Sequence, residues 1–480
     1  MSTARKAAPT LLVIAGLMLG TAGEAAAQVA QPHGPADPAV RPYAPGEIVV
    51  RYRSGTTRSA RAEVRADLGA TVESVSTLKG LQVLDLPPGT PVSSAVDAAQ
   101  SEPQVLYAEP NYRVGHQASP NDPMFDEMWA LGLANSQGVN SGIDTPRVWN
   151  LTTGSPDVTV AVVDSGIDAT HPDLAPNMWT NPGEVAGNGE DDDGNGMIDD
   201  TSGWDWVGGD NSPADENGHG THVAGIVGAR GNNGAGVTGV SWEVRLVSLR
   251  VLDGNGSGWT SDVADAFVYA GKMGVDVVNA SLAGPAFSEA VLEAMGAAPN
   301  TLFVVAAGNS SQNVALTPSY PCSYPLPNII CVAATGQSNQ LSSYSNWGAA
   351  VDLAAPGDQI LSTWPGGTYS ELWGTSMATP HVSGLAALLA AAHPGTSADG
   401  LRAAILAGAE PLSALAGRTA TGGRLSAAGA FEQMGDAVPE EQQPDRLSDD
   451  PRNQDQKKKR CASRRRGHKR ARRRACRSRG

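Results

Sequence analysis

Four short segments carry side chains that could take part in covalent catalysis. Asp164 ends the apolar segment VTVAVVD, His219 lies between two glycines in NGHGTHVAG, and Ser376 precedes the helical pattern ATPHVSGLAALLAAA. A serine hydroxyl becomes a good nucleophile when an imidazole takes its proton, and a carboxylate can orient that imidazole. Asn309, at the end of FVVAAGN, could donate from its amide to a developing oxyanion. Each residue alone could be a helix cap or a turn residue, so any catalytic interpretation depends on their combination.

The two histidines of this set, His219 and His222, are three residues apart. Both would face the same side of a helix, which raises the question of a metal site. The zinc-protease motif His-Glu-x-x-His has a longer spacing and a Glu base, and HGTH has neither. The glycines beside His219 let other groups approach closely. We therefore expect His219 to be the exposed functional imidazole and His222, in the apolar run HVAGI, to be buried and structural.

A carboxylate-rich insertion, GNGEDDDGNGMIDDTSGWDW, lies between the Asp164 and His219 segments. Its pattern matches the ligand positions and the glycine of an EF-hand calcium loop, with ligands expected from Asp191, Asp193, Asn195 and Asp199. Ser202 replaces the usual bidentate Glu, so the loop is not a complete EF-hand. Clustered carboxylates repel one another without a cation, so we expect structural calcium here and no organic cofactor. The alternative is an acidic surface loop without metal.

The elements that must position these side chains follow an alternating pattern over residues 121–434. Apolar strand patterns such as DVTVAVVD, VRLVSLRVL and TLFVVAAGN alternate with helical patterns such as GTHVAGIVGA and TSDVADAFVYAGK. This alternation predicts an α/β fold with a mostly parallel sheet and helices on both faces. Functional residues are expected at the carboxyl ends of such strands. We also expect Pro380 in the first turn of the helix that follows Ser376.

A smaller unit precedes this region, over residues 44–114. EIVVRYR and VLYAEPNYRV read as its first and last strands, and RSARAEVRADLG and PVSSAVDAAQSE as its two helices. With two more strands in TVESVSTLKGLQVLDL, the order is β-α-β-β-α-β. That order predicts a ferredoxin-like α+β fold.

Taken together, the segments AVVDSGI, HGTHVAG and GTSMATPHVSG resemble the Asp, His and Ser motifs of the subtilisin-like serine proteases, the subtilases, in that family's order. The resemblance covers about residues 121–434 and implies a serine endopeptidase that forms an acyl-enzyme. It implies Ser376 as the nucleophile, His219 as the general base and Asp164 as the residue that orients the imidazole. It also implies an oxyanion hole formed by Asn309 and the backbone N–H of Ser376.

The resemblance further implies a groove that binds a polypeptide substrate in an extended form by β-augmentation. One wall would be NASLAG and the other GSG, which makes the expected substrate-binding residues Gly256, Ser257, Gly258, Ser281, Leu282, Ala283, Gly284 and Ser319. Ala283 stands where many family members have glycine, so its methyl group is expected to narrow the primary pocket. We expect a preference for apolar or aromatic side chains.

The ferredoxin-like unit resembles the N-terminal propeptide that chaperones and inhibits many subtilases. The chain would then be an autoinhibited precursor, with its own propeptide as an intramolecular inhibitor and a maturation cleavage between about 114 and 121. The competing interpretation is a catalytically silent surface-binding protein that keeps the subtilase fold.

The N-terminus has the layout of a secretory signal peptide. Arg5 and Lys6 precede the apolar run LLVIAGLML, and small residues follow up to EAAAQ. The run is shorter than the ~20 residues of a membrane span, so we expect cleavage after Ala27, a linker over 28–43 and export. Export permits disulfides, and we expect Cys322 and Cys331, which flank SYPLPNII, to be bridged. The alternative is two free buried thiols.

Charge divides the rest of the chain. The formal net charge is −15, yet residues 457–480 hold 14 of the 34 lysines and arginines and no acidic residue. We expect 435–456 to be an acidic disordered linker and 457–480 a basic disordered tail, which carries Cys461 and Cys476 with no indicated pairing. The tail either tethers the protein to an anionic cell-surface polymer, lipid or nucleic acid or is removed during maturation. The protein is expected to be a secreted monomer, with the tail allowing association with the cell surface.

Overall fold

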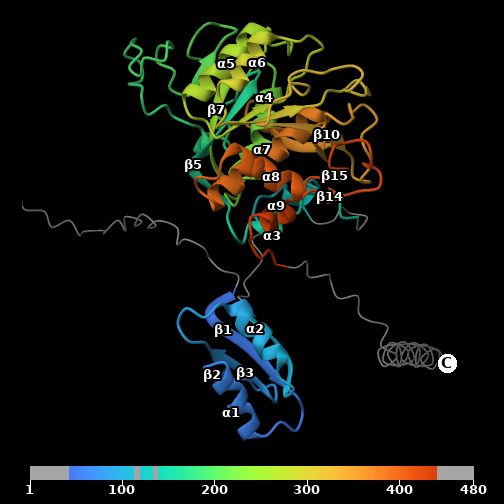
Figure 1. Ribbon diagram of the computed structural model, residues 1–480. Helices are drawn as coiled ribbons and strands as arrows, with labels where there is room; N and C mark the ends of the chain where they lie inside the picture. The colour runs from blue at the N-terminus through green and yellow to red at the C-terminus, as the bar shows by residue number, and fades with distance from the viewer. Residues whose placement is uncertain (1–42, 113–118, 133–138, 440–480) are drawn as a thin grey trace, which may run out of the picture. The chain divides into compact units, whose positions relative to one another are not determined.

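The computed structural model describes residues 43–112, 119–132 and 139–439 (Figure 1). The predicted signal peptide, nearly all of the linker that follows it, most of the acidic linker and the basic tail with Cys461 and Cys476 lie outside the described residues. Most of the expected maturation segment lies outside them too. Within the described ranges, no helix is both long and apolar enough to cross a membrane.

The N-terminal unit has the predicted β-α-β-β-α-β order. Its elements are β1 Tyr43–Tyr52, α1 Arg58–Asp67, β2 Thr71–Val75, β3 Leu81–Asp85, α2 Val92–Ser101 and β4 Val105–Tyr112. The strands form an antiparallel sheet in the order β2-β3-β1-β4. Alternate residues of β1, Ile48 and Val50, point to one face, where they pack with Val64 of α1 and Ala99 of α2. This packing confirms the ferredoxin-like fold.

The larger unit is built on a sheet that has nine strands among the described residues, in the order β14-β15-β11-β10-β9-β8-β5-β7-β6. The strands are β5 Gly154–Asp164, β6 Gly203–Asp205, β7 Glu243–Arg250, β8 Val277–Ala280, β9 Leu302–Ala306, β10 Ile329–Thr335, β11 Leu353–Pro356, β14 Glu410–Pro411 and β15 Gly423–Arg424. All neighbouring strands pair in parallel except β14 and β15. A separate antiparallel hairpin joins β12 Ile360–Trp364 to β13 Thr368–Leu372. The predicted, mostly parallel sheet is therefore confirmed.

Helices cover both faces of this sheet. They are α3 Thr145–Val148, α4 His219–Gly228, α5 Thr260–Lys272, α6 Glu289–Gly296, α7 Thr375–Ala392, α8 Ala398–Ala407 and α9 Ala427–Gln433. Along β5, Val160 and Val162 belong to the core under α4 and α7. Ala161 and Val163 belong to the opposite core under α5 and α6, which lie side by side in Figure 1. Each strand must therefore be apolar at nearly every position, which explains the continuous apolar runs in the sequence.

Helix α7 corrects one prediction. The helix begins one residue before Ser376, so Pro380 lies in its second turn and not in its first. Proline inside a helix removes the hydrogen bond to the carbonyl oxygen four residues earlier, which here belongs to Ser376. The Ser281 hydroxyl donates to that oxygen over 2.8 Å. The orphaned acceptor is therefore satisfied from outside the helix, and α7 continues to Ala392.

Candidate active site

Asp164 and His219 meet where a central strand ends and a helix begins. Asp164 is the last residue of β5 and His219 the first of α4. Oδ1 of Asp164 lies 2.7 Å from Nδ1 of His219, and it also accepts the backbone N–H of Ser165 over 2.8 Å. A carboxylate oxygen accepts, so Nδ1 carries the hydrogen and Nε2 is left with its lone pair. The pair can therefore hold an imidazole that accepts a proton at Nε2.

The electrostatic environment of His219 favours its protonated form. Burial alone would lower the pKa of the imidazole, but the charge and hydrogen bond of Asp164 act in the opposite direction. The charge of Asp215 adds to them, and the net effect raises the pKa of His219 above its ordinary value. A base whose pKa lies near neutral pH is well matched to proton transfer in that range.

Two glycines allow close contacts at the start of α4. Gly218 precedes the helix with φ of +102°, and a Cβ there would lie 2.4 Å from the Trp364 ring. A Cβ at Gly220 would lie 2.1 Å from the carbonyl oxygen of Gly166. A side chain at Gly220 would therefore push the helix away from the strand that carries Asp164. Gly220 thus serves contact with the strand and Gly218 contact with Trp364, while the His219 side chain is only partly exposed.

The other two histidines near the site are buried and neutral. His222 has no exposed surface, and its Nε2 lies 3.0 Å from the carbonyl oxygens of Ile360 and Ser370. Burial lowers its pKa to about 3, which agrees with the structural role expected for it. His381 of α7 donates from Nδ1 to the Met377 carbonyl over 2.8 Å, and burial lowers its pKa to about 4.

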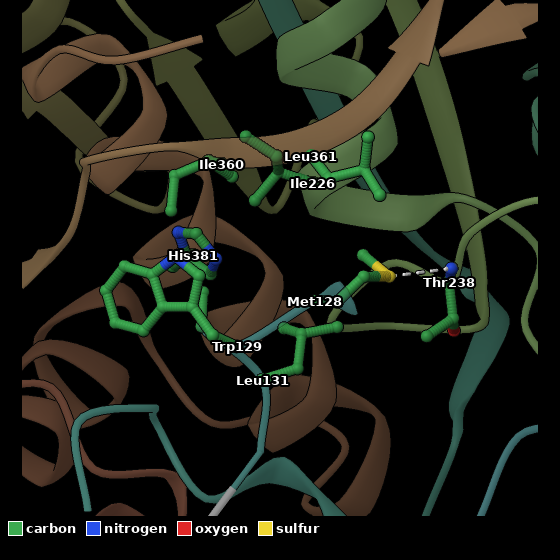
Figure 2. A pocket seen from close by; sticks show the side chains of 9 residues that line it. Met128, Trp129, Leu131, Ile226, Thr238, Ile360, Leu361 and His381 are labelled. Atoms are coloured by element: carbon green, nitrogen blue, oxygen red, sulfur yellow. Dashed lines mark hydrogen bonds between the residues drawn. The ribbon is translucent and has the colours of Figure 1, made fainter. Parts of the chain in front are cut away.

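His381 borders a small internal cavity of about 10 Å³ (Figure 2). The cavity lies among Trp129, Leu131 and Ile226 and is close to the volume of a single water molecule. It is too small for a substrate. We therefore look for the substrate cleft among the described residues around His219.

Ser376 is bonded twice to Ser281, which follows β8. Its Oγ donates to the Ser281 carbonyl oxygen over 3.1 Å, and its own carbonyl oxygen accepts from Ser281 Oγ. Asn279 supports this arrangement, because its Nδ2 donates to Ser281 Oγ over 3.0 Å. Ser376 lies in the first turn of α7, at the positive end of the helix dipole. The hydroxyl is thus fixed at a helix end that favours developing negative charge.

Asn309 faces the residue before Ser376. Its Oδ1 accepts from both the backbone N–H and the hydroxyl of Thr375, each over 2.9 Å. These two bonds define which end of the amide carries the oxygen, and they leave Nδ2 as a donor. An amide donor held beside Ser376 is suited to an oxyanion that forms on the attacked carbonyl.

A cleft of about 680 Å³ lies beside these groups, and Asp164 and Asn309 are not among its lining residues. His219 and Ser376 both line it, together with seven of the expected substrate-binding residues, namely Gly256, Ser257, Gly258, Ser281, Leu282, Ala283 and Gly284. Gly284 and Tyr320 exchange backbone hydrogen bonds of 2.9 and 2.8 Å, which closes one end of the wall. Ser319 is buried and lies behind this wall beside Gly308, so it is not among the lining residues. The volume of the cleft lies within the range of pockets that bind ligands.

The sequence model of the Subtilase family matches residues 155–446. The chain belongs to the subtilase family. A second model, that of the fervidolysin N-terminal prodomain, matches residues 30–111. The chain is therefore a subtilisin-family serine protease with an N-terminal prodomain, as the three motifs and the ferredoxin-like unit predicted.

Several proteins of known sequence or structure resemble this subtilase. It is 37% identical over 350 residues to the thermophilic serine proteinase of Bacillus sp. (strain AK1), which covers 72% of this chain and 78% of the relative. It is 39% identical over 297 residues to thermitase of Thermoactinomyces vulgaris, covering 62% of this chain and 93% of thermitase. A solved protease structure from Pseudoalteromonas arctica PAMC 21717 covers 66% of this chain and 99% of its own, with a TM-score of 0.53 and 31% identity.

In the insertion of this subtilase, one of the carboxylates expected from the sequence lies in a cluster with two others. Ligand atoms of Glu184, Asp193 and Asp200 lie within 4.8 Å of one another. Asp193 is the only carboxylate of the expected set in this group. Asp191 instead accepts the backbone N–H groups of residues 194, 195 and 196, and Asp199 accepts those of residues 188 and 189. Both carboxylates serve to shape the loop backbone.

The expected Asn195 borders the carboxylate group without supplying an oxygen to it. Its Nδ2 donates to Asp193 and Asp200 over 3.0 and 2.9 Å, and its Oδ1 accepts the N–H of Met197. Asp200 is fully buried and accepts from the Tyr269 hydroxyl over 2.5 Å. Glu184 and Asp200 were missed because neither follows the EF-hand spacing. For these two residues, the only hint in the sequence is that Asp200 follows directly after another aspartate.

Cys322 and Cys331 form a disulfide. The bridge fixes the segment after Tyr320, which borders the cleft, to strand β10, which carries Cys331. The expected pairing is therefore present, and the alternative of two free thiols is excluded for these residues in the structure.

Proposed function

We propose that this subtilase is a secreted endopeptidase that cleaves polypeptides through an acyl-enzyme on Ser376. The observation that carries this proposal is the 2.7 Å bond between Asp164 and His219, beside a cleft that His219 shares with Ser376. Nε2 of His219 takes the hydroxyl proton as Oγ attacks the scissile carbonyl carbon. The same nitrogen then gives that proton to the leaving amine. Water, activated by the same imidazole, releases the acyl group and restores Ser376.

The resting hydroxyl must first turn, because it donates to the Ser281 carbonyl. In the proposed mechanism the hydroxyl leaves this carbonyl and donates to Nε2 of His219. Asn309 Nδ2 and the backbone N–H of Ser376 are the donors for the oxyanion, and Asp164 stabilises the imidazolium that forms. Because the donors are fixed before substrate arrives, little reorganisation is needed during the reaction.

The substrate proposed for this site is an extended peptide with an apolar or aromatic side chain on the acyl side of the scissile bond. Leu252, Val263 and Val291 contribute apolar surface to the cleft, and Tyr320 and Tyr324 add aromatic rings. The walls at 256–258 and 281–284 offer backbone groups to an added strand. Ala283 lines the cleft, so its methyl group is proposed to restrict side-chain size there. Ser319, placed behind the wall, would act on the pocket through its neighbours.

Replacement of Ser376 by alanine tests the mechanism. The variant is expected to lose peptide hydrolysis and labelling by a fluorophosphonate probe, while its circular dichroism still shows a folded protein. Ser343→Ala is the control, because Ser343 is exposed and lies outside the cleft. Labelling of the Ser376→Ala protein would contradict the assignment. A folded, mature wild-type protein that is neither active nor labelled would instead favour the silent surface-binding alternative.

The N-terminal unit, proposed over 44–114, would inhibit the catalytic unit in the precursor until a bond between about 114 and 121 is cut. If the cut is autocatalytic, the Ser376→Ala precursor should keep its prodomain, while the wild-type secreted form should lose it. N-terminal sequencing and intact mass of both forms measure this. Processing of both precursors at the same bond would show that another protease makes the cut.

Calcium is proposed to order the insertion through Glu184, Asp193 and Asp200, with Asp191, Asn195 and Asp199 as the further ligands expected from the sequence. Carboxylate oxygens are the ligands that calcium prefers, and three of them converge here. In the Ser376→Ala background, which prevents autolysis, a chelator should lower the thermal midpoint and remove bound calcium. Glu184→Gln or Asp200→Asn should remove most of that dependence, whereas Asp265→Asn, on the exposed face of α5, should keep it. An unchanged midpoint and metal content with chelator would contradict the proposal.

The proposals for the two ends of the chain concern residues outside the described ranges. Residues 1–27 are proposed to direct secretion, and residues 457–480 to tether the protein to an anionic surface or to be removed. Release of the intact enzyme from cells by salt would support the tether, and salt-independent retention would oppose it. The mature enzyme is proposed to be a monomer, which its mass in solution would test.

A further inference from the structure

A second carboxylate, that of Asp215, lies behind the His219 segment and accepts five hydrogen bonds. Its Oδ1 accepts from Ser165 Oγ and from the backbone N–H groups of Asn217 and Gly218, over 2.9, 2.9 and 2.8 Å. Its Oδ2 accepts from the backbone N–H and the hydroxyl of Thr221, over 2.9 and 2.6 Å. Five donors to one carboxylate hold it in one orientation, and the bonds are strong when it is ionised.

These bonds cap helix α4 from outside its first turn. Gly218 is the residue at the N-cap position and has no side chain to cap the helix. Asp215 supplies the missing acceptor, because it binds the N–H groups of Gly218 and Thr221 on either side of His219. A negative charge at a helix N-terminus is also favoured by the helix dipole. The backbone around His219 is therefore fixed by Asp215.

The same carboxylate reaches the strand that carries Asp164. Ser165 Oγ donates to Asp215 and accepts the backbone N–H of Gly220 over 2.9 Å. The backbone N–H of Ser165 in turn donates to Asp164 Oδ1, the atom that binds His219. Asp215 thus connects the end of β5 to the start of α4 through residues adjacent to both members of the Asp164–His219 pair.

We propose that Asp215 is a positioning residue for proteolysis, which holds the His219 imidazole against Asp164 and places a second negative charge behind it. The proposal rests on the proposed role of His219 as the general base. Asp215 does not line the cleft, so it acts on the reaction through His219 and through the helix that carries it.

The charge of Asp215 gives this role a measurable signature. With Asp164, it raises the pKa of His219 against the effect of burial. The groups on the surrounding elements leave this effect intact. His222 of α4 and His381 of α7 are neutral, with pKa values of about 3 and about 4, and Glu216 is paired with Arg250 of β7 over 2.6 Å.

Asp215→Asn, in the mature enzyme made from the full chain, tests the proposal through the pH dependence of kcat/KM. Loss of the negative charge lowers the pKa of His219, so the acidic limb should move to lower pH. Misplacement of the imidazole should lower kcat about tenfold to hundredfold, with KM nearly unchanged. A fall in kcat with an unmoved acidic limb, or an unchanged kcat, would overturn the proposal. Glu216→Gln is the matched control and should leave the limb in place.

The Ser165→Ala variant separates the effect of the hydrogen bond between Asp215 and Ser165 from the effect of the Asp215 charge. It removes the link from Asp215 to β5 but keeps both carboxylates, so kcat should fall while the acidic limb stays in place. This variant also decides the case if Asp215→Asn does not fold, because wild-type kcat in Ser165→Ala would overturn the positioning role. Inactivity of the wild-type enzyme, or full activity of His219→Ala, would mark failure of the proposed function instead.

Discussion

Pro380 lies four residues after Ser376 in helix α7, and the Ser376 carbonyl oxygen accepts its hydrogen bond from Ser281 instead of from the helix. Ser376 Oγ returns a hydrogen bond to the Ser281 carbonyl. The proline thus frees one acceptor, and a serine from the end of β8 uses it. This reciprocal contact joins the start of α7 to the wall of the cleft.

Replacement of Ser281 by alanine should destabilise this joint. The Ser376 carbonyl loses its donor and Asn279 loses its acceptor, and an unsatisfied buried polar group costs about 1–3 kcal/mol. We expect a loss of that size in the free energy of unfolding, together with a lower kcat. Denaturant unfolding in the Ser376→Ala background measures the change in the free energy of unfolding, because that background prevents autolysis. An unfolding free energy equal to that of the parent would show that the contact contributes little.

Replacement of Asn309 by alanine should impair the chemical step. The amide Nδ2 is lost while Thr375 and Ser376 remain, so the effect should fall on the oxyanion. We expect kcat to fall roughly 100- to 1,000-fold with little change in KM. Steady-state kinetics on a peptide amide checks this, with the exposed Asn300→Ala as the control. A change confined to KM would place Asn309 in substrate binding alone.

The acidic limb of kcat/KM should lie above pH 6.5, the ordinary pKa of histidine. Burial lowers the pKa of His219, but Asp164 and Asp215 outweigh it and raise the net value. Only the neutral imidazole can accept the Ser376 proton, so a raised pKa extends the inactive form to higher pH. A pH series with an uncharged peptide substrate measures the limb. A limb at or below pH 6.5 would contradict the electrostatic account.

The raised pKa of His219 also predicts how the stability of the folded protein depends on pH. Stability should fall as the pH rises, whereas activity should increase. The protonated imidazole gains its partners only in the folded protein, so this contribution is fully present below pH 6.5. It is lost as the pH rises through the folded-state pKa.

Removal of the Cys322–Cys331 disulfide should lower stability moderately. A loop of about ten residues contributes about 2.5 kcal/mol in the chain-entropy description. The double variant Cys322→Ser, Cys331→Ser, in the Ser376→Ala background, should lose a comparable unfolding free energy. Treatment of the parent with a reductant under unfolding conditions should give the same stability as the double variant. Equal stability of the parent and double variant would mean that the bridge does not limit the unfolded chain.

Much of the architecture follows from local sequence patterns. The continuous apolar runs of β5, β7 and β9 predicted buried parallel strands, because both faces of such strands are covered. The helices that begin at His219 and Thr260 follow apolar periodicities that a short window can reveal. The motifs that contain Asp164, His219 and Ser376 were visible for the same reason, since their residues are close neighbours in the chain.

The carboxylate cluster required the tertiary structure. The EF-hand spacing names candidate ligands along the chain, but it does not show that Asp191 and Asp199 accept backbone N–H groups. Glu184 and Asp200 are distant from each other in the chain, and only the folded loop brings them to Asp193.

The sequence by itself determined the family, the two folds and the residues proposed for the chemistry, because local periodicity and short motifs record them. Tertiary structure alone decided which distant groups support those residues. Asp215 reaches Ser165 across fifty positions, and Ser281 reaches Ser376 across ninety-five. Such contacts depend on how β5, β8, α4 and α7 pack against one another. Packing is a property of the whole core, and no short stretch of the chain carries it.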